Sequence, residues 1–254
     1  MASARVAAIL SGVAGGSTPL AALPQRLVVA CARELPITGA AIVLMTDSGP
    51  AGTVAATDGP AAIMEELQFT LGEGPCVDSS RTGRPVLQAD LARSGPRRWP
   101  GFSAGALEAG LRAIFAFPLR VGGIRLGVLD LYRDQPGVLS EAELTEALSF
   151  ADAATAILLH LQAEGAPGTA DLGSIPVIED RAEVHQATGM IAVEAGVPLA
   201  QALVLLRARA FAAERPILEL ARDVLTRAVR FTTDTDGAIH GHEDYRFDPT
   251  QGQQ

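Results

Sequence analysis

The clearest hydrophobic pattern lies in residues 178–231. Apolar residues recur there every three or four positions in three successive stretches, and each stretch has one narrow apolar stripe. Gly196-Val197-Pro198 separates the first two stretches, and Arg215-Pro216 precedes the third, where a proline suits the start of a helix. Because each stripe can be buried only against the other two, the pattern predicts a three-helix bundle. The stripes are Val184, Ala187, Ile191 and Ala195; Leu199, Ala202, Leu203, Leu206 and Ala210; and Ile217, Leu220, Ala221, Val224, Ala228 and Phe231.

The preceding part of the chain mixes helical spacing with short apolar runs of strand length. Residues 20–31 have helical spacing, which places Cys31 on the apolar side of a helix. Residues 39–45 and 53–57 read as two strands around a turn, and together they predict an antiparallel hairpin. Residues 61–67 predict a short helix.

A second hairpin and a long helix complete this half. Residues 112–120 and 124–132 flank Val121-Gly122-Gly123, and glycines permit the positive φ of a tight turn. Ser140 and Glu143 form a capping box for a helix that extends to about residue 162. Antiparallel strands between helices predict an α+β sandwich. In the second arm, Ile124, Leu126, Val128 and Asp130 alternate to one side of the strand.

This half resembles a GAF domain over residues 20–163. The resemblance rests on the first hairpin, on residues 71–76 (Leu-Gly-Glu-Gly-Pro-Cys), on residues 118–129 of the second hairpin and on the closing helix. It implies a small-molecule sensor, although the lysine-bearing cyclic-nucleotide motif of the family is missing. Residues 1–19 are expected to form an N-terminal arm.

The three-helix stretch resembles an ANTAR domain, the RNA-binding module of bacterial transcription antitermination regulators. Thr188 stands where that family usually has a lysine, and Pro198 stands where it has a serine or threonine cap. Residues 164–177 are rich in glycine and alanine and predict a linker, and residues 232–254 predict a disordered acidic tail. The matching residues are Ala187, Thr188, Gly189, Gln201, Ala202, Leu203, Leu206, Arg207, Leu220, Ala221 and Val224.

Composition narrows the possible functions. The net charge of −9 argues against nucleic-acid binding by the chain as a whole. Residues 1–177 carry 12 arginines against 17 acidic residues, whereas residues 178–231 carry seven of each. RNA binding would therefore need arginines gathered on one side of the bundle. The candidate RNA contacts are Arg181, His185, Gln186, Thr188, Gly189, Arg207, Arg209, Arg227 and Arg230.

Candidate ligand contacts in the sensor half are Cys76, Arg98, Trp99 and Phe102. The last three fall in a predicted long loop, residues 90–107, that could cover a bound ligand. Trp99 could equally close the edge of the core, and Cys76 could be a buried residue of a tight glycine turn. No cofactor is indicated by the sequence.

Catalysis and metal binding are not expected. Two cysteines, Cys31 and Cys76, are too few for a cysteine zinc site, and the four histidines lack metal-ligand spacing; His240 and His242 fall in the tail. No apolar run reaches the length of a membrane span, so we expect no membrane partner and a cytoplasmic location. Residues 1–16 mimic a secretory signal, but a first helix or arm is the simpler interpretation.

The sequence thus predicts a cytoplasmic antitermination regulator whose sensor half controls binding of hairpin RNA in transcript leaders. The alternatives are a DNA-binding regulator and a redox sensor or enzyme that uses Cys76. The helix at 140–162 has a second apolar stripe beyond Leu144, Leu148, Ala151 and Leu158, which predicts a homodimer. This second stripe consists of Phe150, Ala154, Ile157 and Leu161.

Overall fold

The computed structural model describes residues 2–15, 19–46, 49–164, 181–233 and 239–243. The chain divides into two compact units, Met1–Glu179 and Asp180–Gln254. The predicted linker, 164–177, lies almost wholly outside the described residues.

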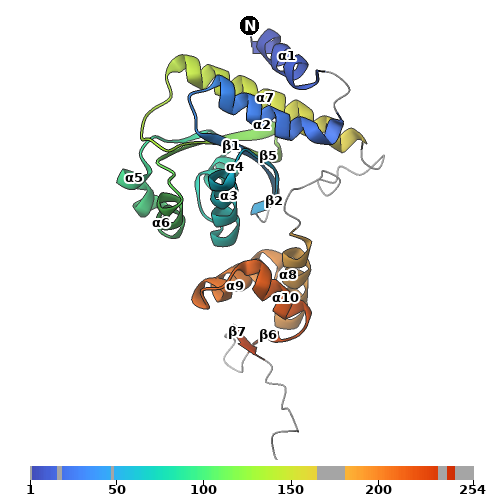
Figure 1. The fold of residues 1–254 in the computed structure, drawn as a ribbon. Helices are drawn as coiled ribbons and strands as arrows, with labels where there is room; N and C mark the ends of the chain where they lie inside the picture. The colour runs from blue at the N-terminus through green and yellow to red at the C-terminus, as the bar shows by residue number, and fades with distance from the viewer. Residues whose placement is uncertain (1, 16–18, 47–48, 165–180, 234–238, 244–254) are drawn as a thin grey trace, which may run out of the picture. The chain divides into compact units, whose positions relative to one another are not determined.

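The N-terminal unit is built on a five-stranded antiparallel sheet with strand order β2-β1-β5-β4-β3 (Figure 1). Both predicted hairpins are present, and β1 joins them by pairing with β5. The short edge strand β3 was not predicted. The strands are β1 Gly39–Thr46, β2 Gly49–Ala56, β3 Val86–Gln88, β4 Ala113–Val121 and β5 Ile124–Arg133.

The predicted alternation along β5 is wrong at Leu126. Leu126 belongs to the same apolar cluster as Leu129 and Leu131, whereas Val128 belongs to the cluster on the opposite face. The reason is an irregularity in the β4–β5 pairing beside Leu119 and Arg120. Such a bulge inserts one extra residue and reverses the side to which the following side chains point.

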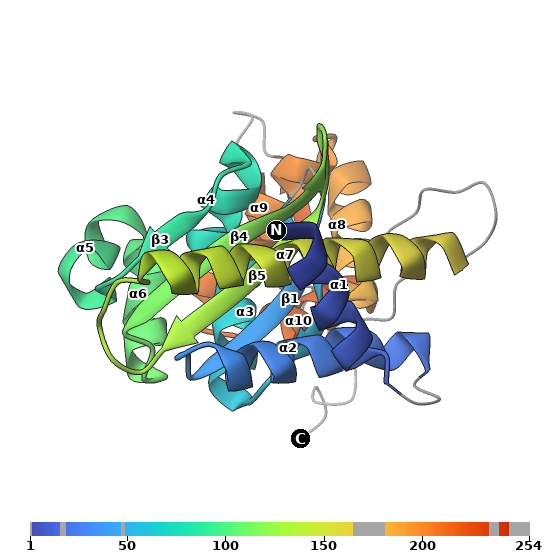
Figure 2. The ribbon, with the colours of Figure 1, turned by 90° about the horizontal axis from the view of Figure 1, so that it is seen from above.

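Two helices, α2 (Leu23–Glu34) and α7 (Glu141–Glu164), cover one face of the sheet, and α1 (Ala2–Val13) lies over them on the side away from the sheet (Figure 1 and Figure 2). The predicted N-terminal arm is in fact α1, which packs on α2 and α7. Its residues Ile9 and Val13 are buried, and Arg5 Nε donates to a Glu146 carboxylate oxygen of α7 at 2.8 Å. A 3₁₀ turn, Leu20–Ala22, leads into α2, where Cys31 is buried as predicted.

Helix α7 begins with the predicted capping box. The backbone N–H of Ser140 donates to Glu143 at 2.6 Å, and the N–H of Glu143 donates to the Ser140 hydroxyl at 3.3 Å. Among the described residues, α7 alone is long and apolar enough for a membrane span, and α8 and α9 pass that test only as a pair bent by 107°. Half of the α7 span is buried inside the protein, so packing accounts for its apolar composition.

The second apolar stripe of α7 is not free for a partner. Phe150, Ala154, Ile157 and Leu161 are all buried in the same cluster as the sheet residues and α1. The dimer surface predicted on Ile157 and Leu161 is therefore wrong. Leu148, expected to pack inward, is instead 43% exposed.

Four helices cover the opposite face: α3 (Gly59–Leu71), α4 (Pro75–Thr82), α5 (Leu91–Arg98) and α6 (Pro100–Glu108) (Figure 1). The predicted long loop at 90–107 is wrong, because α5 and α6 occupy it. Asp90 caps α5 by accepting from the Arg93 N–H at 3.1 Å, and Pro100 occupies the first turn of α6.

The C-terminal unit contains the three predicted helices, α8 (Ala182–Ala195), α9 (Leu199–Ala212) and α10 (Ile217–Leu225), each packed on the other two. The third helix is shorter than predicted, because the chain turns at Arg227 and continues as strand β6 (Val229–Thr233). Strand β6 pairs with β7 (Ile239–Glu243), so part of the predicted disordered tail, including His240 and His242, is a strand. Residues 234–238 and 244–254 lie outside the described residues.

Candidate functional site

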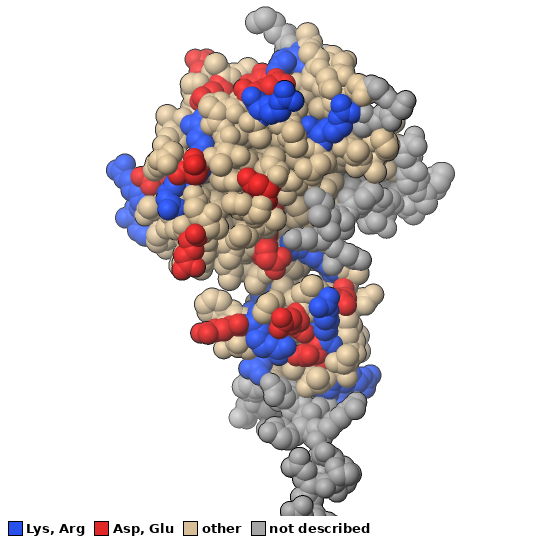
Figure 3. Space-filling model, in the orientation of Figure 1, with Lys and Arg blue, Asp and Glu red and all other residues tan. Residues whose placement is uncertain are grey.

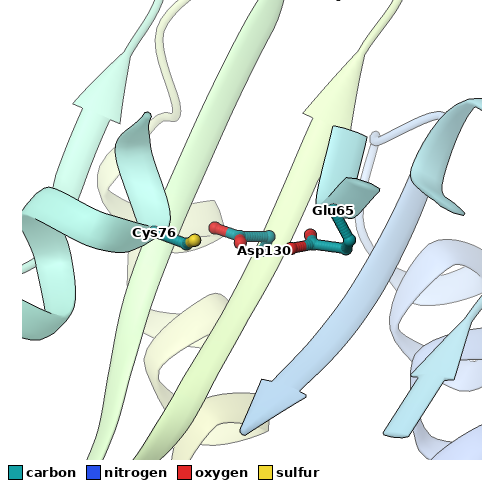
Figure 4. A group of neighbouring side chains, drawn as sticks. All are labelled: Glu65, Cys76 and Asp130. Atoms are coloured by element: carbon teal, nitrogen blue, oxygen red, sulfur yellow. The ribbon is translucent and has the colours of Figure 1, made fainter. Parts of the chain in front are cut away.

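A buried group of polar side chains lies between the sheet and helices α3 and α4 of the N-terminal unit. Glu65 comes from α3, Cys76 from α4 and Asp130 from the central strand β5, and all three are buried. In Figure 4 the carboxyl group of Asp130 lies between the thiol of Cys76 and the carboxyl group of Glu65. We call Glu65, Cys76 and Asp130 the buried triad.

Glycines at the α3–α4 junction bring Cys76 to this position. Gly72 ends α3 with a φ of 66°, and Gly74 has a φ of 136° directly before Pro75 opens α4. Such backbone conformations favour glycine because it has no Cβ. The chain therefore reverses within three residues, and Cys76, in the first turn of α4, faces the sheet.

One amide group connects all three members of the triad. Gln68 Nε2 donates to Asp130 Oδ2 at 3.2 Å and to Glu65 Oε2 at 3.3 Å. Gln68 Oε1 accepts from the backbone N–H of Cys76 at 2.7 Å. Gln68 is itself fully buried. Its side chain therefore sets the positions of two carboxyl groups and of the turn that carries the thiol.

Asp130 and Glu65 form a buried pair of carboxyl groups. Burial raises the pKa of Asp130 to about 7, although hydrogen bonds with Glu65 and Gln68 act in the opposite direction. The carboxyl groups of Asp130 and Glu65 are close enough to share a proton, and neither Glu65 nor Gln68 carries positive charge. A shared proton or a cation is needed to keep this pair buried.

The donor atoms of the triad lie close enough to bind one ion. A carboxylate oxygen of Glu65, Cys76 Sγ and a carboxylate oxygen of Asp130 all lie within 4.8 Å of one another. The sulfur of a cysteine and the oxygens of carboxylates are both ligands of zinc and related metals. The arrangement can therefore hold either a proton or a metal ion.

Comparison with known proteins decides the family. A family model described as GAF domain matches residues 18–159, more than half of the chain. The chain belongs to the GAF domain family. No curated protein matches the chain.

Several solved structures are similar to part of the chain. The GAF domain of a phosphoenolpyruvate-protein phosphotransferase from Acinetobacter is 15% identical, with a TM-score of 0.49 over 65% of this chain and 96% of that chain. The corresponding domain from Coxiella burnetii is 17% identical, with a TM-score of 0.48 over 64% and 95%. A type II free methionine-R-sulfoxide reductase from Thermoplasma acidophilum is 15% identical, with a TM-score of 0.41 over 55% and 94%.

The four predicted ligand contacts separate into core and surface groups of the GAF domain. Cys76, Trp99 and Phe102 are buried in one apolar cluster, where the rings of Trp99 and Phe102 meet edge to face at 6.4 Å. Arg98 is at the surface, with its guanidinium 4.5 Å from the centre of the Trp99 ring and 2.8 Å from Asp78. Trp99 is thus part of the core, which agrees with the interpretation that it closes the edge of the core and not with a residue of a loop that covers a ligand.

Two of the predicted RNA contacts in or next to α8 are poorly placed to contact RNA. Arg181 is buried at the N-terminal end of α8, and Thr188 is buried with its hydroxyl donating to the Val184 carbonyl at 2.7 Å. Gly189, a third predicted contact, lies in open space, because a Cβ there would meet no described atom within 4 Å. His185 and Gln186, in contrast, are exposed.

The remaining arginines are spread over the C-terminal unit. Arg207 and Arg209 are half-buried on α9. The predicted third helix, whose stripe reached Phe231, would have included Arg227 and Arg230, but Arg227 lies in a turn with a φ of 61° and Arg230 lies in β6. Arg227 is exposed, whereas Arg230 is 3.7 Å from Glu194.

Sequence reasoning missed Glu65, Gln68 and Asp130 as site residues. One signal was available: Asp130 is the lone charged residue in the apolar run from Leu126 to Leu131. A carboxylate that faces a core from a central strand needs a partner, so its presence predicts a buried polar site. Glu65 and Gln68 carried no such signal, because Glu65 is a polar residue of the short helix predicted at 61–67 and Gln68 directly follows that helix.

Proposed function

We propose that this protein is a cytoplasmic, signal-responsive regulator in which the GAF domain controls RNA binding by the C-terminal unit. That unit would act as an ANTAR-type module and bind a hairpin in nascent RNA. A bound hairpin would be stabilised against a competing terminator hairpin, so transcription would continue. The GAF domain would respond to a small-molecule ligand.

The observation that carries this proposal is the core of the C-terminal unit. The apolar residues on which the ANTAR resemblance rests are the ones that hold α8, α9 and α10 together, rather than residues scattered over the surface. The residues shared with the ANTAR family are therefore core residues, and a shared three-helix fold requires a shared core. These buried residues are Ala187, Ala202, Leu203, Leu206, Leu220, Ala221 and Val224.

Individual exposed groups of the unit suit contacts with RNA, but its arginines are not gathered on one side, the arrangement that the balance of charge had led us to expect. Residues 181–233 carry seven arginines and five acidic residues, and both kinds are interspersed on the face seen in Figure 3. RNA is held through its phosphates by arginine and is read by stacking and hydrogen bonds to splayed bases. His185, Gln186 and Arg227 are exposed and are the best-placed candidates, ahead of half-buried Arg207, Arg209 and Arg230.

A homodimer remains part of the proposal, with a contact surface other than the buried stripe of α7. Two copies of the C-terminal unit in one assembly would hold two neighbouring hairpins at high effective concentration. Sedimentation of the full chain at micromolar concentration tests this assembly.

The experiment that tests RNA binding is retention of a labelled hairpin RNA by the full chain over a range of salt concentrations. We expect Arg227→Ala to weaken binding and to reduce the salt slope by about 1, as for loss of one phosphate contact. Arg84→Ala, an exposed arginine of the GAF domain, removes the same charge and should bind as the unchanged protein does. Equal effects of the two substitutions would contradict the proposal.

The same assay decides between RNA and DNA. Unlabelled duplex DNA of matched length should not displace the hairpin if the C-terminal unit is an RNA-binding module. Displacement at equal concentration would support the DNA-binding alternative, in which three short helices act as a helix-turn-helix.

A two-cysteine redox enzyme fits the structure poorly. Cys31 is buried in the cluster under α2 and α7, whereas Cys76 is buried in the cluster on the other face of the sheet. The sheet separates the two sulfurs, so they cannot form a disulfide within the folded domain. We propose that the protein is not an enzyme, and turnover of methionine sulfoxide that Cys76→Ser abolishes would contradict this.

A further inference from the structure

We propose that the buried triad of Glu65, Cys76 and Asp130 is a binding site for one divalent transition-metal ion of the zinc and iron(II) class. The site deepens the proposed sensor role of the GAF domain, because it names the chemical class of the bound group. It is independent of whether the C-terminal unit binds RNA.

The first observation is convergence of suitable ligands. Three donor atoms from α3, α4 and β5 lie within 4.8 Å of one another, and no two of the residues share an element. In a tetrahedral site, zinc–oxygen bonds of about 2.0 Å and a zinc–sulfur bond of about 2.3 Å place the ligand atoms roughly 3.3–3.5 Å apart. Side-chain rotations that move the donor atoms about 1 Å closer together would therefore bring all three within bonding distance of one ion.

A second, independent observation points to a missing partner. Asp130 has no exposed surface, and its Oδ1 has no hydrogen-bond partner among the described residues. Buried carboxylate oxygens nearly always have a hydrogen-bond partner, and one without a partner is destabilising, especially when it is charged. A cation between Asp130 and Glu65 would satisfy this oxygen and neutralise both carboxylates. Two carboxylates and one thiolate carry three negative charges, which a divalent ion largely compensates.

The ligand set selects the kind of metal. Magnesium and calcium prefer six or more oxygen ligands, whereas a thiolate favours zinc, iron(II) and their neighbours. Three protein ligands leave one tetrahedral position open, as in sites that exchange a water or a small ligand. Gln68 has the role of a supporting residue, since its amide hydrogen-bonds both carboxylates and the Cys76 backbone. The sequence alone had predicted no metal site, because it offered no recognisable ligand spacing.

The test uses the full chain, stripped of metal by a chelator and titrated with cobalt(II), which reports thiolate ligation through a charge-transfer absorption band. We expect the band to saturate at one ion per chain and to disappear when zinc displaces cobalt. Magnesium at the same concentration should leave it unchanged. Zinc should also raise the melting temperature, since an ion that binds only the folded state stabilises it.

Matched variants locate the site. Cys76→Ser should abolish the band, whereas Cys31→Ser, which alters the other buried cysteine, should keep it. Asp130→Asn keeps the shape of the side chain but removes a charged ligand, so cobalt affinity should fall at least about 10-fold. Circular dichroism of each metal-free variant establishes that it is folded, and Asp130→Asn provides the decision if Cys76→Ser does not fold.

Either of two results would overturn the proposal: no stoichiometric band in the unchanged protein, or an undiminished band in Cys76→Ser or Asp130→Asn. In that case the two carboxyl groups share a proton instead. RNA retention is measured separately, so failure of the cobalt titration leaves the regulator proposal standing, and failure of RNA binding leaves the metal site standing.

Discussion

The side-chain carbonyl of Gln68 accepts a hydrogen bond of 2.7 Å from the backbone N–H of Cys76. This bond joins helix α3 to helix α4 across the glycine turn, while the same amide donates to Glu65 and Asp130. The buried amide of Gln68 therefore contributes to the stability of the GAF domain through three hydrogen bonds.

Gln68→Leu should lower the free energy of unfolding of the GAF domain by about 1–3 kcal/mol, because it leaves buried polar groups without their partner. Trp99, the only tryptophan, lies in this domain, so urea unfolding followed by its fluorescence isolates the effect. Gln201→Leu, at an exposed position of α9, should leave that transition unchanged. A Gln68→Leu protein as stable as the original would show that the amide is not essential.

Gly74 and Gly189 should respond in opposite ways to alanine. A Cβ on Gly74 would lie 2.6 Å from Gln68 Oε1 at a φ of 136°, so Gly74→Ala should cost about 1–3 kcal/mol. Gly189 lies within α8 in open space, so Gly189→Ala should stabilise the C-terminal unit by about 0.5–1 kcal/mol. Thermal melting followed by circular dichroism measures both. A destabilising Gly189→Ala would contradict this and would indicate that another part of the chain approaches Gly189 closely.

Asp78 should prove important for holding the indole ring of Trp99 in its buried position. Its Oδ2 accepts from the Trp99 indole at 3.2 Å and from Arg98 Nε at 2.9 Å, and the Arg98 guanidinium stacks on the indole. Asp78→Ala should therefore destabilise the GAF domain by about 1–3 kcal/mol and shift Trp99 fluorescence toward that of exposed indole. Asp152→Ala, at an exposed site on α7, is the control that should change neither quantity.

Two apolar residues of α7, two positions apart, should differ sharply when replaced by glutamate. Ile157 is 3% exposed and packs in the core, so Ile157→Glu should cost about 4 kcal/mol or more. Leu159 is 40% exposed, and Leu159→Glu should change stability by no more than about 0.5 kcal/mol. Urea unfolding with Trp99 fluorescence measures the difference. A folded, equally stable Ile157→Glu monomer would revive the dimer surface on this stripe.

The capping box of α7 predicts a pH dependence. The backbone N–H of Ser140 hydrogen-bonds the Glu143 carboxylate and lowers its pKa, with nearby Arg133 adding to the effect. Because the folded pKa lies below the unfolded one, the stabilisation is present above about pH 4.3 and is lost as pH falls through the folded pKa. Glu143→Ala should cost about 0.5–1 kcal/mol near pH 7, since solvent screens the exposed pair.

That cost should shrink as pH falls through the folded pKa of Glu143, because the carboxyl group then becomes protonated in the folded state as well. Urea unfolding at several pH values measures it. Glu141→Ala, in the same first turn but outside the box, gives the baseline. A pH-independent difference between the two variants would mean that the capping hydrogen bond does not depend on the charge of Glu143.

Local signals determined much of the fold. The stripes around Leu206 and Leu220, the glycine turn at Gly122, and the pair Ser140–Glu143 act over a few residues, so they predicted the bundle, the second hairpin and the start of α7. The same signals failed where burial overrides local preference. Residues 90–107 were predicted to be a loop, but α5 and α6 form because Leu91, Trp99 and Phe102 are buried against the sheet.

The site was decided by tertiary structure alone. Gln68 and Asp130 are 62 residues apart in the chain, and their hydrogen bond exists only because the sheet places β5 beneath α3. Whether a carboxylate is solvated or buried beside a second carboxylate and a thiol depends on what covers it, and no local spacing records that. The sequence could show that Asp130 interrupts an apolar strand. The packing of α3 and α4 over that strand determines which side chains it meets.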